Sequence, residues 1–267
     1  MISEHWASGR STISRLLSQR WDWRQPNGRL KDLSCRYILL ALEAKGEIEL
    51  PPRQTESHRY PRRADRKVFD VDASPLEGSV GDFRSLTINM VRGTNDEALW
   101  DYLVDTYHYL GRPWIVGSYL KHLVHLDGRL VACLGWGSAA LKVGCRDEFI
   151  GWNAETRNVN LYKVVNNVRF LVLPWVRVEH LASKALALNL RILASDWQRF
   201  YCHEIALAET FVDTERFQGT CYKAANWTRI GVTKGRGRYD RYNKCAESVK
   251  AVYLYPLTRD YRERLHG

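Results

Sequence analysis

The apolar positions of the chain form two kinds of run, short continuous ones and longer ones with helical spacing. Val168–Leu173 is a continuous run with the length of a buried strand, and Pro174 ends it by removing a ladder donor. Ile205–Val212 is a second such run. Between them we predict a helix, because apolar residues recur every three or four positions, at Leu181, Ala185, Leu188 and Ile192.

The segment before these runs alternates in the same way between strand and helix patterns. Phe83–Met90 has the pattern of a strand, and Asn95–Tyr107 has an acidic start followed by a helical apolar stripe. The dipeptide Asp127-Gly128 is a strong hairpin signal between two apolar runs, Tyr119–Leu126 and Leu130–Trp136. With a last strand at Val252–Leu257, the pattern predicts an α/β domain.

The first fifty residues have a pattern of their own. Ser11–Trp21 and Leu30–Lys45 are predicted helices on either side of the turn-prone Asn27-Gly28, and Gly46 ends the second helix before the short strand EIEL. This order is typical of a winged helix, in which the second helix enters the major groove. Phosphate contacts would come from Arg29, Lys31 and Arg36. The alternative is a small helical packing domain.

These patterns predict three regions. Residues 1–52 form the winged-helix-like module, residues 53–80 a basic linker, and residues 81–267 the α/β domain. The linker is rich in proline and in basic residues, among them Arg62 and Arg63, which would lie along a phosphate backbone.

Charge and composition narrow the choice of partner. The formal net charge of +10 and the pI of about 9.4 favour a polyanion, and nucleic acid, either DNA or RNA, is the leading candidate. The alternative is that the basic surface is simply solvated. The longest apolar runs are too short to span a membrane, so we expect no membrane partner and a cytoplasmic location. The six cysteines show no C-x-x-C pairing, which argues against both a zinc site and a disulfide framework.

Two carboxylates follow each other on one face of ETFVD, if that segment is extended. Glu209 and Asp213 would then project from the same side of a strand, and Asp196 or Asp147 could join them to hold Mg²⁺ for phosphodiester hydrolysis. We therefore assign Glu209 and Asp213 as metal ligands, and both, with Asp196, as catalytic candidates. The alternative is that Asp196 caps a turn and Glu209 pairs with a basic neighbour.

Tyr222 is the fourth catalytic candidate. A phenol can donate a proton or attack phosphorus when a base or cation lies nearby, although packing would explain Tyr222 equally well. Cys221 is a weaker candidate. A glycine-spaced run would let three cations reach phosphates, at Lys234, Arg236 and Arg238.

Two signatures resemble those of the GNAT-type acyl-CoA-dependent N-acyltransferases. Pro174, Arg177, His180 and Ala182 occupy the spacing Pro-x-x-[Arg/Gln]-x-x-Gly-x-[Gly/Ala], and Tyr222–Trp227 is similar to the family's Tyr-x-x-x-Gly-Phe. The resemblance implies a GNAT-like fold with a mixed, mostly antiparallel sheet, and a helix start that binds the pyrophosphate of coenzyme A. Here His180 replaces the glycine of that cradle, so acetyl-CoA is not expected to bind. Arg177 and His180 would meet a nucleic-acid phosphate instead.

Over nearly its full length the chain resembles the DruA family of Druantia anti-phage defence proteins, which has transposon-associated relatives. The phrases that carry this resemblance are LKDLSCRYILLALEAKGEIELPP, YHYLG, RDEFIGW, NNVRFLVLPWV, LASKAL, DW, ETFVD, GTCYKAANW and GVTKGRGR. The resemblance implies a defence or mobile-element setting. We expect a DNA-binding component of such a system and leave open whether it is an enzyme; if it is one, a DNA endonuclease or nickase is favoured over an N-acyltransferase. The alternatives are an N-acyltransferase and a non-catalytic adaptor that recruits a helicase or nuclease.

Overall fold

The computed structural model describes the chain except for residues 25–27, 29, 53–66, 114, 116, 236–247 and 267. The chain divides into two compact units, Met1–Arg66 and Lys67–Gly267. The predicted linker extended to residue 80, but β1 (Leu76–Ser79) is already paired within the second unit. The boundary therefore lies closer to the N-terminus than the composition indicated.

The first unit is built on two helices, α1 (Gly9–Arg20) and α2 (Asp32–Ala44), after the short 3₁₀ helix η1 (Trp6–Ser8). Both predicted helices are confirmed. Ile13 and Leu17 of α1 are buried with three residues of the α2 segment and its exit, Cys35, Leu39 and Leu50. The bidentate ion pair of Arg10 with Glu43 ties the start of α1 to the end of α2.

The winged-helix interpretation of this unit gains no support. The predicted strand EIEL is not formed at residues 47–50, and the only β contact among the unit's described residues is the isolated bridge between Arg24 and Leu30. Helical spacing places Leu33, Tyr37, Leu40 and Ala44 on one face of α2, and that face is not the buried one, because Leu33 and Tyr37 are 53% and 66% exposed. Helical spacing alone allows either face of α2 to be the buried one, and α1 packs on the Cys35 and Leu39 side.

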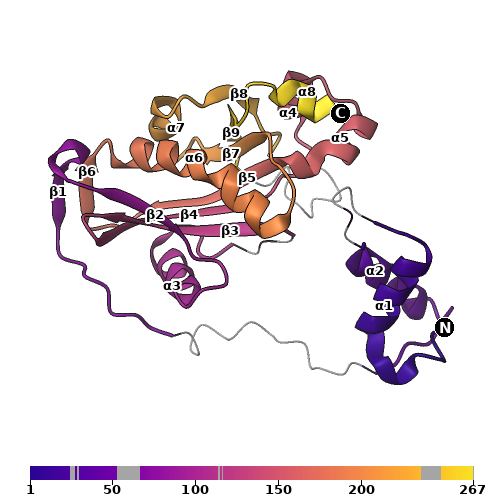
Figure 1. Cartoon of the computed structure of the whole chain (residues 1–267). Coiled ribbons are helices and arrows are strands. Elements are labelled where there is room, and N and C mark those ends of the chain that lie inside the picture. Colours follow the sequence, from indigo (N-terminus) through magenta and orange to yellow (C-terminus); the bar gives the residue numbers. More distant parts are fainter. Residues whose placement is uncertain are drawn as a thin grey trace. The chain divides into compact units, whose positions relative to one another are not determined.

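The second unit is built on a seven-stranded sheet in the order β2-β3-β4-β5-β7-β9-β8 (Figure 1). Only the β5–β7 pair within it is parallel. The strand bounds are β2 Leu86–Met90, β3 Tyr119–Leu126, β4 Arg129–Ser138, β5 Val164–Val172, β7 Leu207–Asp213, β8 Thr228–Val232 and β9 Lys250–Pro256. The predicted α/β fold with a mixed, mostly antiparallel sheet is confirmed. Asp127 and Gly128 form the predicted turn, both with positive φ.

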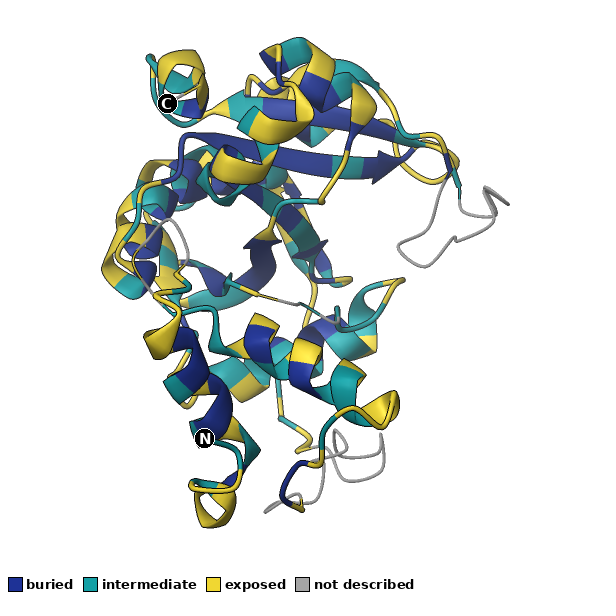
Figure 2. Ribbon diagram, turned by 90° about the vertical axis from the view of Figure 1, so that its right-hand side faces the viewer, coloured by how far each residue is buried: buried dark blue, intermediate teal, exposed yellow. Residues whose placement is uncertain are grey.

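Helices cover both faces of this sheet (Figure 1). A side chain at Gly135 would meet Trp100 of α3 (Glu97–Tyr107), whereas its neighbour Trp136 donates to Asn189 of α6 (Leu181–Tyr201). Because successive side chains of a strand point to opposite faces, α3 and α6 lie on opposite sides. The central strands are correspondingly buried, and the helices alternate between buried and exposed positions (Figure 2).

Several elements were not predicted. The segment between the hairpin and β5 forms two short helices, α4 (Gly144–Ile150) and α5 (Ala154–Asn160), and β6 (Val176–Glu179) pairs in parallel with β1 in a separate two-stranded sheet. The other unpredicted elements are α8 Tyr261–His266 and the 3₁₀ turns η3 Val80–Asp82 and η4 Leu161–Lys163, whereas α7 (Thr220–Ala224) is the helix expected after the ETFVD strand. All the unpredicted elements are short and polar, so periodicity gives little signal.

Candidate functional site

The sheet opens between its two parallel strands. β5 and β7 pair only over Val164–Asn167 against Leu207–Thr210, after which β5 stays with β4 and β7 stays with β9. A bulge lies at the same level, because Gly135 pairs with Arg169 while Trp136 pairs with Asn167. Bulges re-aim side chains and are frequent beside active sites. We call the part of β5 and β7 beyond Asn167 and Thr210 the open end, and the paired part the closed end.

Tyr222 of α7 lies at the point where the strands separate. Its phenol donates to the Oδ1 atom of Asn167 at 2.7 Å, and the hydroxyl of Thr210 lies 3.5 Å away. The Asn167 amide in turn donates to the carbonyl of Gly135 at 3.1 Å. Burial raises the pKa of Tyr222 well above its usual value. The residue is 8% exposed, so these contacts describe a buried structural hydrogen-bond network.

Glu209 lies at the closed end and is fully buried. Its Oε1 atom accepts the Ala140 N–H at 2.8 Å and its Oε2 atom accepts from Arg146 at 2.9 Å. Burial alone would lower the pKa of Arg146, but the carboxylates of Glu209 and Asp147 outweigh burial and the net shift is upward. Glu209 therefore does pair with a basic neighbour, as the structural alternative stated, and Asp147 belongs to the same ion-pair network.

Asp213 ends β7 at the open end, on the same face of the strand as Glu209 and roughly 14 Å farther along the backbone at about 3.4 Å per residue. Its Oδ1 atom accepts the Glu215 N–H at 3.2 Å, and its Oδ2 atom lies 3.9 Å from the Nε atom of Arg216. The assignment of Mg²⁺ to Glu209 and Asp213 stays a prediction, and no three His, Cys, Asp or Glu side chains in the described part of the chain are grouped to hold a metal.

Aromatic and basic side chains gather around Asp213. The guanidinium of Arg216 lies 5.1 Å from the ring centroid of Tyr109, and the ring of Phe217 lies 5.4 Å from it. Tyr109 is 42% exposed and Phe217 is 50% exposed. We call these side chains, together with that of Arg169, the open-end cluster: Tyr109, Arg169, Asp213, Arg216 and Phe217.

Arg169 enters the cluster from β5, directly after the bulge. It donates to the carbonyl oxygens of Gly111 at 2.8 Å and Val168 at 2.7 Å. Among the described residues no carboxylate lies within ion-pair distance of it. Burial lowers the pKa of Arg169, which is the sign of a half-buried charge without an opposite charge beside it.

His108 supports the ring of Tyr109. The two rings stack with centroids 4.8 Å apart, and the Nδ1 atom of His108 accepts the Leu110 N–H at 3.2 Å. Burial, with a smaller effect of the nearby charge on Arg169, lowers the pKa of His108 to about 4. The imidazole is therefore neutral near pH 7, and the hydrogen bond at Nδ1 places its proton on Nε2.

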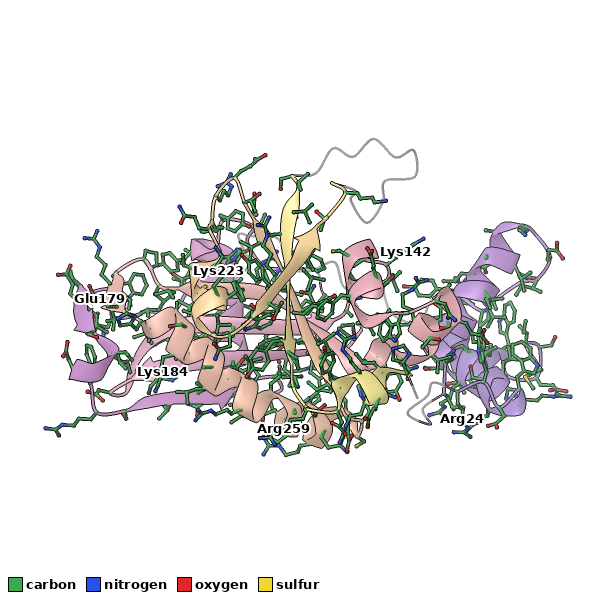
Figure 3. All side chains as sticks on the ribbon, turned by 90° about the horizontal axis from the view of Figure 1, so that it is seen from above. Arg24, Lys142, Glu179, Lys184, Lys223 and Arg259 are labelled. Atoms are coloured by element: carbon green, nitrogen blue, oxygen red, sulfur yellow. The ribbon has the colours of Figure 1, made fainter. Side chains whose placement is uncertain are left out.

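The predicted phosphate cradle at the start of α6 differs from a glycine-lined one. His180 has φ 63° and is the residue before α6, so a side chain occupies a left-handed position that glycine would fill without strain. The carboxylate of Glu179 precedes it and projects outward, as Lys184 does from α6 (Figure 3). Arg177 is 80% exposed and lies 4.0 Å from Glu77. A carboxylate beside the helix start disfavours an anion there.

Asp196 does not join the other catalytic candidates. Its Oδ2 atom lies 3.0 Å from the Nε2 atom of fully buried His122, and its Oδ1 atom accepts from Arg199 at 2.7 Å. His122 belongs to β3 and Asp196 to α6, so the pair ties the long helix to the sheet. Tyr222 and Asp196 are on the α6 side of the sheet, whereas Glu209 and Asp213 face the other side.

The predicted nucleic-acid contacts are only partly described. The Lys31 ammonium lies 6.0 Å from the Trp23 ring, the Nε atom of Arg36 is buried without a hydrogen-bond partner, and Lys234 is exposed. Five predicted contacts lie outside the described residues, namely Arg29, Arg62, Arg63, Arg236 and Arg238.

Two other sequence predictions concern reactivity and membranes. Cys221 is half-buried, and burial raises the pKa of its thiol. In the part of the chain that the structure describes, every helix is too short or too polar to serve as a membrane span.

Sequence reasoning missed most of the open-end cluster. Tyr109 lies in YHYLG and Arg169 in NNVRF, and Arg216-Phe217 directly follows ETFVD. The available signal was an aromatic residue just after a predicted helix and an Arg-Phe pair just after a predicted strand. Neither signal shows that the two segments meet, because about a hundred residues separate them.

Solved structures similar to this chain include several acetyltransferases. An N-acetyltransferase from Staphylococcus aureus Mu50 has a TM-score of 0.39 at 8% identity, with 65% of this chain and 99% of that chain covered. A probable acetyltransferase from Staphylococcus epidermidis has a TM-score of 0.42 at 11% identity, with 65% and 100% covered. The ribosomal-protein-S18-alanine N-acetyltransferase from Escherichia coli has a TM-score of 0.37 at 12% identity, with 65% and 95% covered.

In sequence, residues 47–252 match the model of one protein family, described as Druantia protein DruA. No curated protein matches the chain. The matched range contains the whole open-end cluster and most of the second unit, and it leaves out the two helices of the first unit.

Proposed function

Because the chain belongs to the Druantia protein DruA family, we propose that it is a DNA-binding protein of a Druantia-type defence system and that the open-end cluster contacts the DNA. One observation carries the proposal. Arg169 is a half-buried cation without a carboxylate among its described neighbours, and it lies beside exposed aromatic rings.

The positive charge of Arg169 destabilises the fold unless an anion pairs with it. Partial burial removes water from the guanidinium, and the carbonyls of Gly111 and Val168 offer only dipoles in return. A phosphate group would supply the missing negative charge, and the planar guanidinium matches its oxygens. Arg216, whose side chain is 61% exposed, adds a second cation to the same cluster.

The two exposed rings suit the bases of a nucleic acid. The ring centroids of Tyr109 and Phe217 lie 5.4 Å apart, and the two residues are 42% and 50% exposed, so they form a small aromatic surface rather than a single exposed side chain. Stacking of a base on an aromatic side chain contributes about 1–3 kcal/mol. Cations for phosphates and rings for bases together favour a polynucleotide over an inorganic anion.

The test is fluorescence anisotropy of the full chain with labelled single-stranded and duplex DNA over a salt series. We expect binding that weakens with salt, and Arg216→Gln should lower the log–log salt slope by up to about one. Phe217→Ala should weaken binding by roughly 5- to 100-fold.

Two matched variants serve as controls. Arg259→Gln removes an exposed arginine outside the cluster, and Tyr37→Ala removes an aromatic side chain that is 66% exposed in the first unit. Neither should change the affinity as much as the cluster variants. No binding even at low salt would contradict the proposal. A loss with Tyr37→Ala that exceeds the loss with Phe217→Ala would place the contact on the first unit.

A further inference from the structure

Tyr109 differs from Tyr222 in the property that a nucleophile requires, which is access to a substrate. Tyr222 is 8% exposed and gives its proton to Asn167. Tyr109 is 42% exposed, and its ring contacts those of His108 and Phe217. A partly exposed ring that is oriented by its neighbours loses little freedom when it attacks a bound group.

The surroundings of Tyr109 contain the other groups needed for attack on phosphorus. Arg216 contacts both the Tyr109 ring, at 5.1 Å, and the Asp213 carboxylate, at 3.9 Å, so the phenol and the carboxylate flank one guanidinium. Burial and the negative charge of Asp213 raise the pKa of Tyr109, while the charges of Arg169 and Arg216 act in the opposite direction. The phenol is therefore protonated near pH 7 and needs a base during attack.

We propose that Tyr109 is a nucleophile that attacks a DNA phosphodiester and forms a transient phosphotyrosyl bond, an inference that rests on the proposed DNA binding. In this step a bond forms between the Tyr109 hydroxyl oxygen and phosphorus, and one bond from phosphorus to a deoxyribose oxygen breaks. The phenolic proton passes to the Asp213 carboxylate, and the departing alkoxide takes a proton from water. Asp213 then returns its proton to the solvent, so protons and charge balance.

The two arginines would stabilise the charge on phosphorus. A pentavalent phosphorus carries more negative charge on its equatorial oxygens than the diester does, and cations held in place beforehand stabilise that charge. Arg169 is held by two backbone carbonyls, and Arg216 by the ring of Tyr109. His108 is a positioning residue, because it stacks on Tyr109 and its Nδ1 atom is occupied by the Leu110 N–H.

The test uses the full chain and DNA oligonucleotides with random flanks around one bridging phosphorothiolate, with sulfur in the 5′ position in one set and in the 3′ position in the other. The sulfur leaves as a thiolate that attacks poorly in reverse, so a covalent adduct accumulates. We expect an adduct that survives SDS electrophoresis with one of the two sets, on the peptide that contains Tyr109. Tyr109→Phe keeps the ring and removes only the hydroxyl, and at saturating DNA a change in affinity does not enter, so it should give at least about 100-fold less adduct.

Two further variants separate the roles of the side chains. Tyr222→Phe should still form the adduct, within about threefold of the wild-type yield, because its hydroxyl is committed to Asn167. Asp213→Asn should slow adduct formation by about 10²- to 10⁴-fold. Its rate should keep rising with pH into the alkaline range, because the phenol must then ionise without a base.

Failure of this inference and failure of DNA binding give different results. If the wild-type chain binds the oligonucleotides but forms no adduct with either sulfur position, Tyr109 is not a nucleophile and the proposed DNA binding stands. An adduct on another residue, or an equal yield with Tyr109→Phe, also overturns the inference. If the chain binds no DNA at any salt concentration, the proposed function fails and this inference fails with it.

Discussion

The closed and open ends of the β5–β7 pair carry one carboxylate each, and the two carboxylates differ in their hydrogen-bond and ion-pair partners. Glu209 is fully buried, with hydrogen bonds of 2.8 and 2.9 Å to Ala140 and Arg146. Asp213, four residues on and on the same face, has one hydrogen bond of 3.2 Å and an arginine at 3.9 Å. Both carboxylates are buried, so the number and distance of their partners distinguish them, and this difference is the basis of the role proposed for Asp213.

The largest loss of stability should come from removing the buried ion pairs of Arg146 at the closed end. Arg146→Met leaves the carboxylates of Glu209 and Asp147 buried without their main cation, so the free energy of unfolding should fall by about 3–5 kcal/mol in urea denaturation followed by circular dichroism. Arg199→Met removes a 72% exposed arginine paired with Asp196, and this control should cost less than about 1 kcal/mol. Equal losses in the two variants would mean that burial does not distinguish these ion pairs.

A smaller loss of stability is expected at Tyr222, which lies where β5 and β7 separate. Tyr222→Phe leaves the Oδ1 atom of Asn167 without its 2.7 Å donor, which should lower the free energy of unfolding by about 1–3 kcal/mol. Tyr109→Phe, at the open end, should change it by less than about 0.5 kcal/mol because that hydroxyl is partly in water. The urea midpoints of the two variants measure the difference. A greater loss of unfolding free energy for Tyr109→Phe than for Tyr222→Phe would mean that Tyr109, not Tyr222, supplies the hydroxyl that stabilises the fold.

The open end should also show a modest pH dependence of stability through His108. Its folded-state pKa is about 4, below the roughly 6.5 of an exposed histidine, so the unfolded chain takes up the proton first. Stability is therefore present above about pH 6.5 and is lost as the pH falls towards 4. The ring is only partly buried, so we expect less than about 1 kcal/mol over this range. Urea midpoints between pH 7 and 4 should fall less for His108→Asn, which keeps an acceptor for Leu110; parallel curves would contradict this.

No binding of an acyl donor is expected at the start of α6. Calorimetry with acetyl-CoA should give no binding heat, because His180 occupies the left-handed position before α6 and Glu179 adds negative charge beside it. His180→Gly is the matched variant and should also show no binding heat, since Glu179 remains. Saturable heat with the wild-type chain would favour the N-acyltransferase alternative over DNA binding.

Much of the fold could be predicted from local pattern. β3 was predicted to the residue, the Asp127-Gly128 turn was correct, and α3 and α6 follow apolar stripes. The first unit shows where this reasoning fails. The α2 sequence is apolar on more than one face, so the pattern could not tell that Cys35 and Leu39 would be buried and that Leu33 and Tyr37 would be exposed.

The candidate site was predictable only in part. ETFVD indicated two carboxylates on one face of a strand, which β7 confirms. The sequence could not show that Arg146 neutralises the first carboxylate, because 63 residues separate Arg146 from Glu209. The contact of Arg216 with Tyr109 joins two loops that are still farther apart in the chain.

The sequence by itself determined the family, the alternation of strands and helices, and the basic character of the chain, because these depend on residue types and on spacing along one segment. The tertiary structure alone decided that Glu209 pairs with Arg146, that Tyr109 is more exposed than Tyr222, and that Arg169 has no carboxylate within ion-pair distance among the described residues. Those properties depend on where β5 and β7 stop pairing and on the contact between the segments that carry Tyr109 and Arg216. They are set by contacts between distant segments, and local spacing carries no information about such contacts.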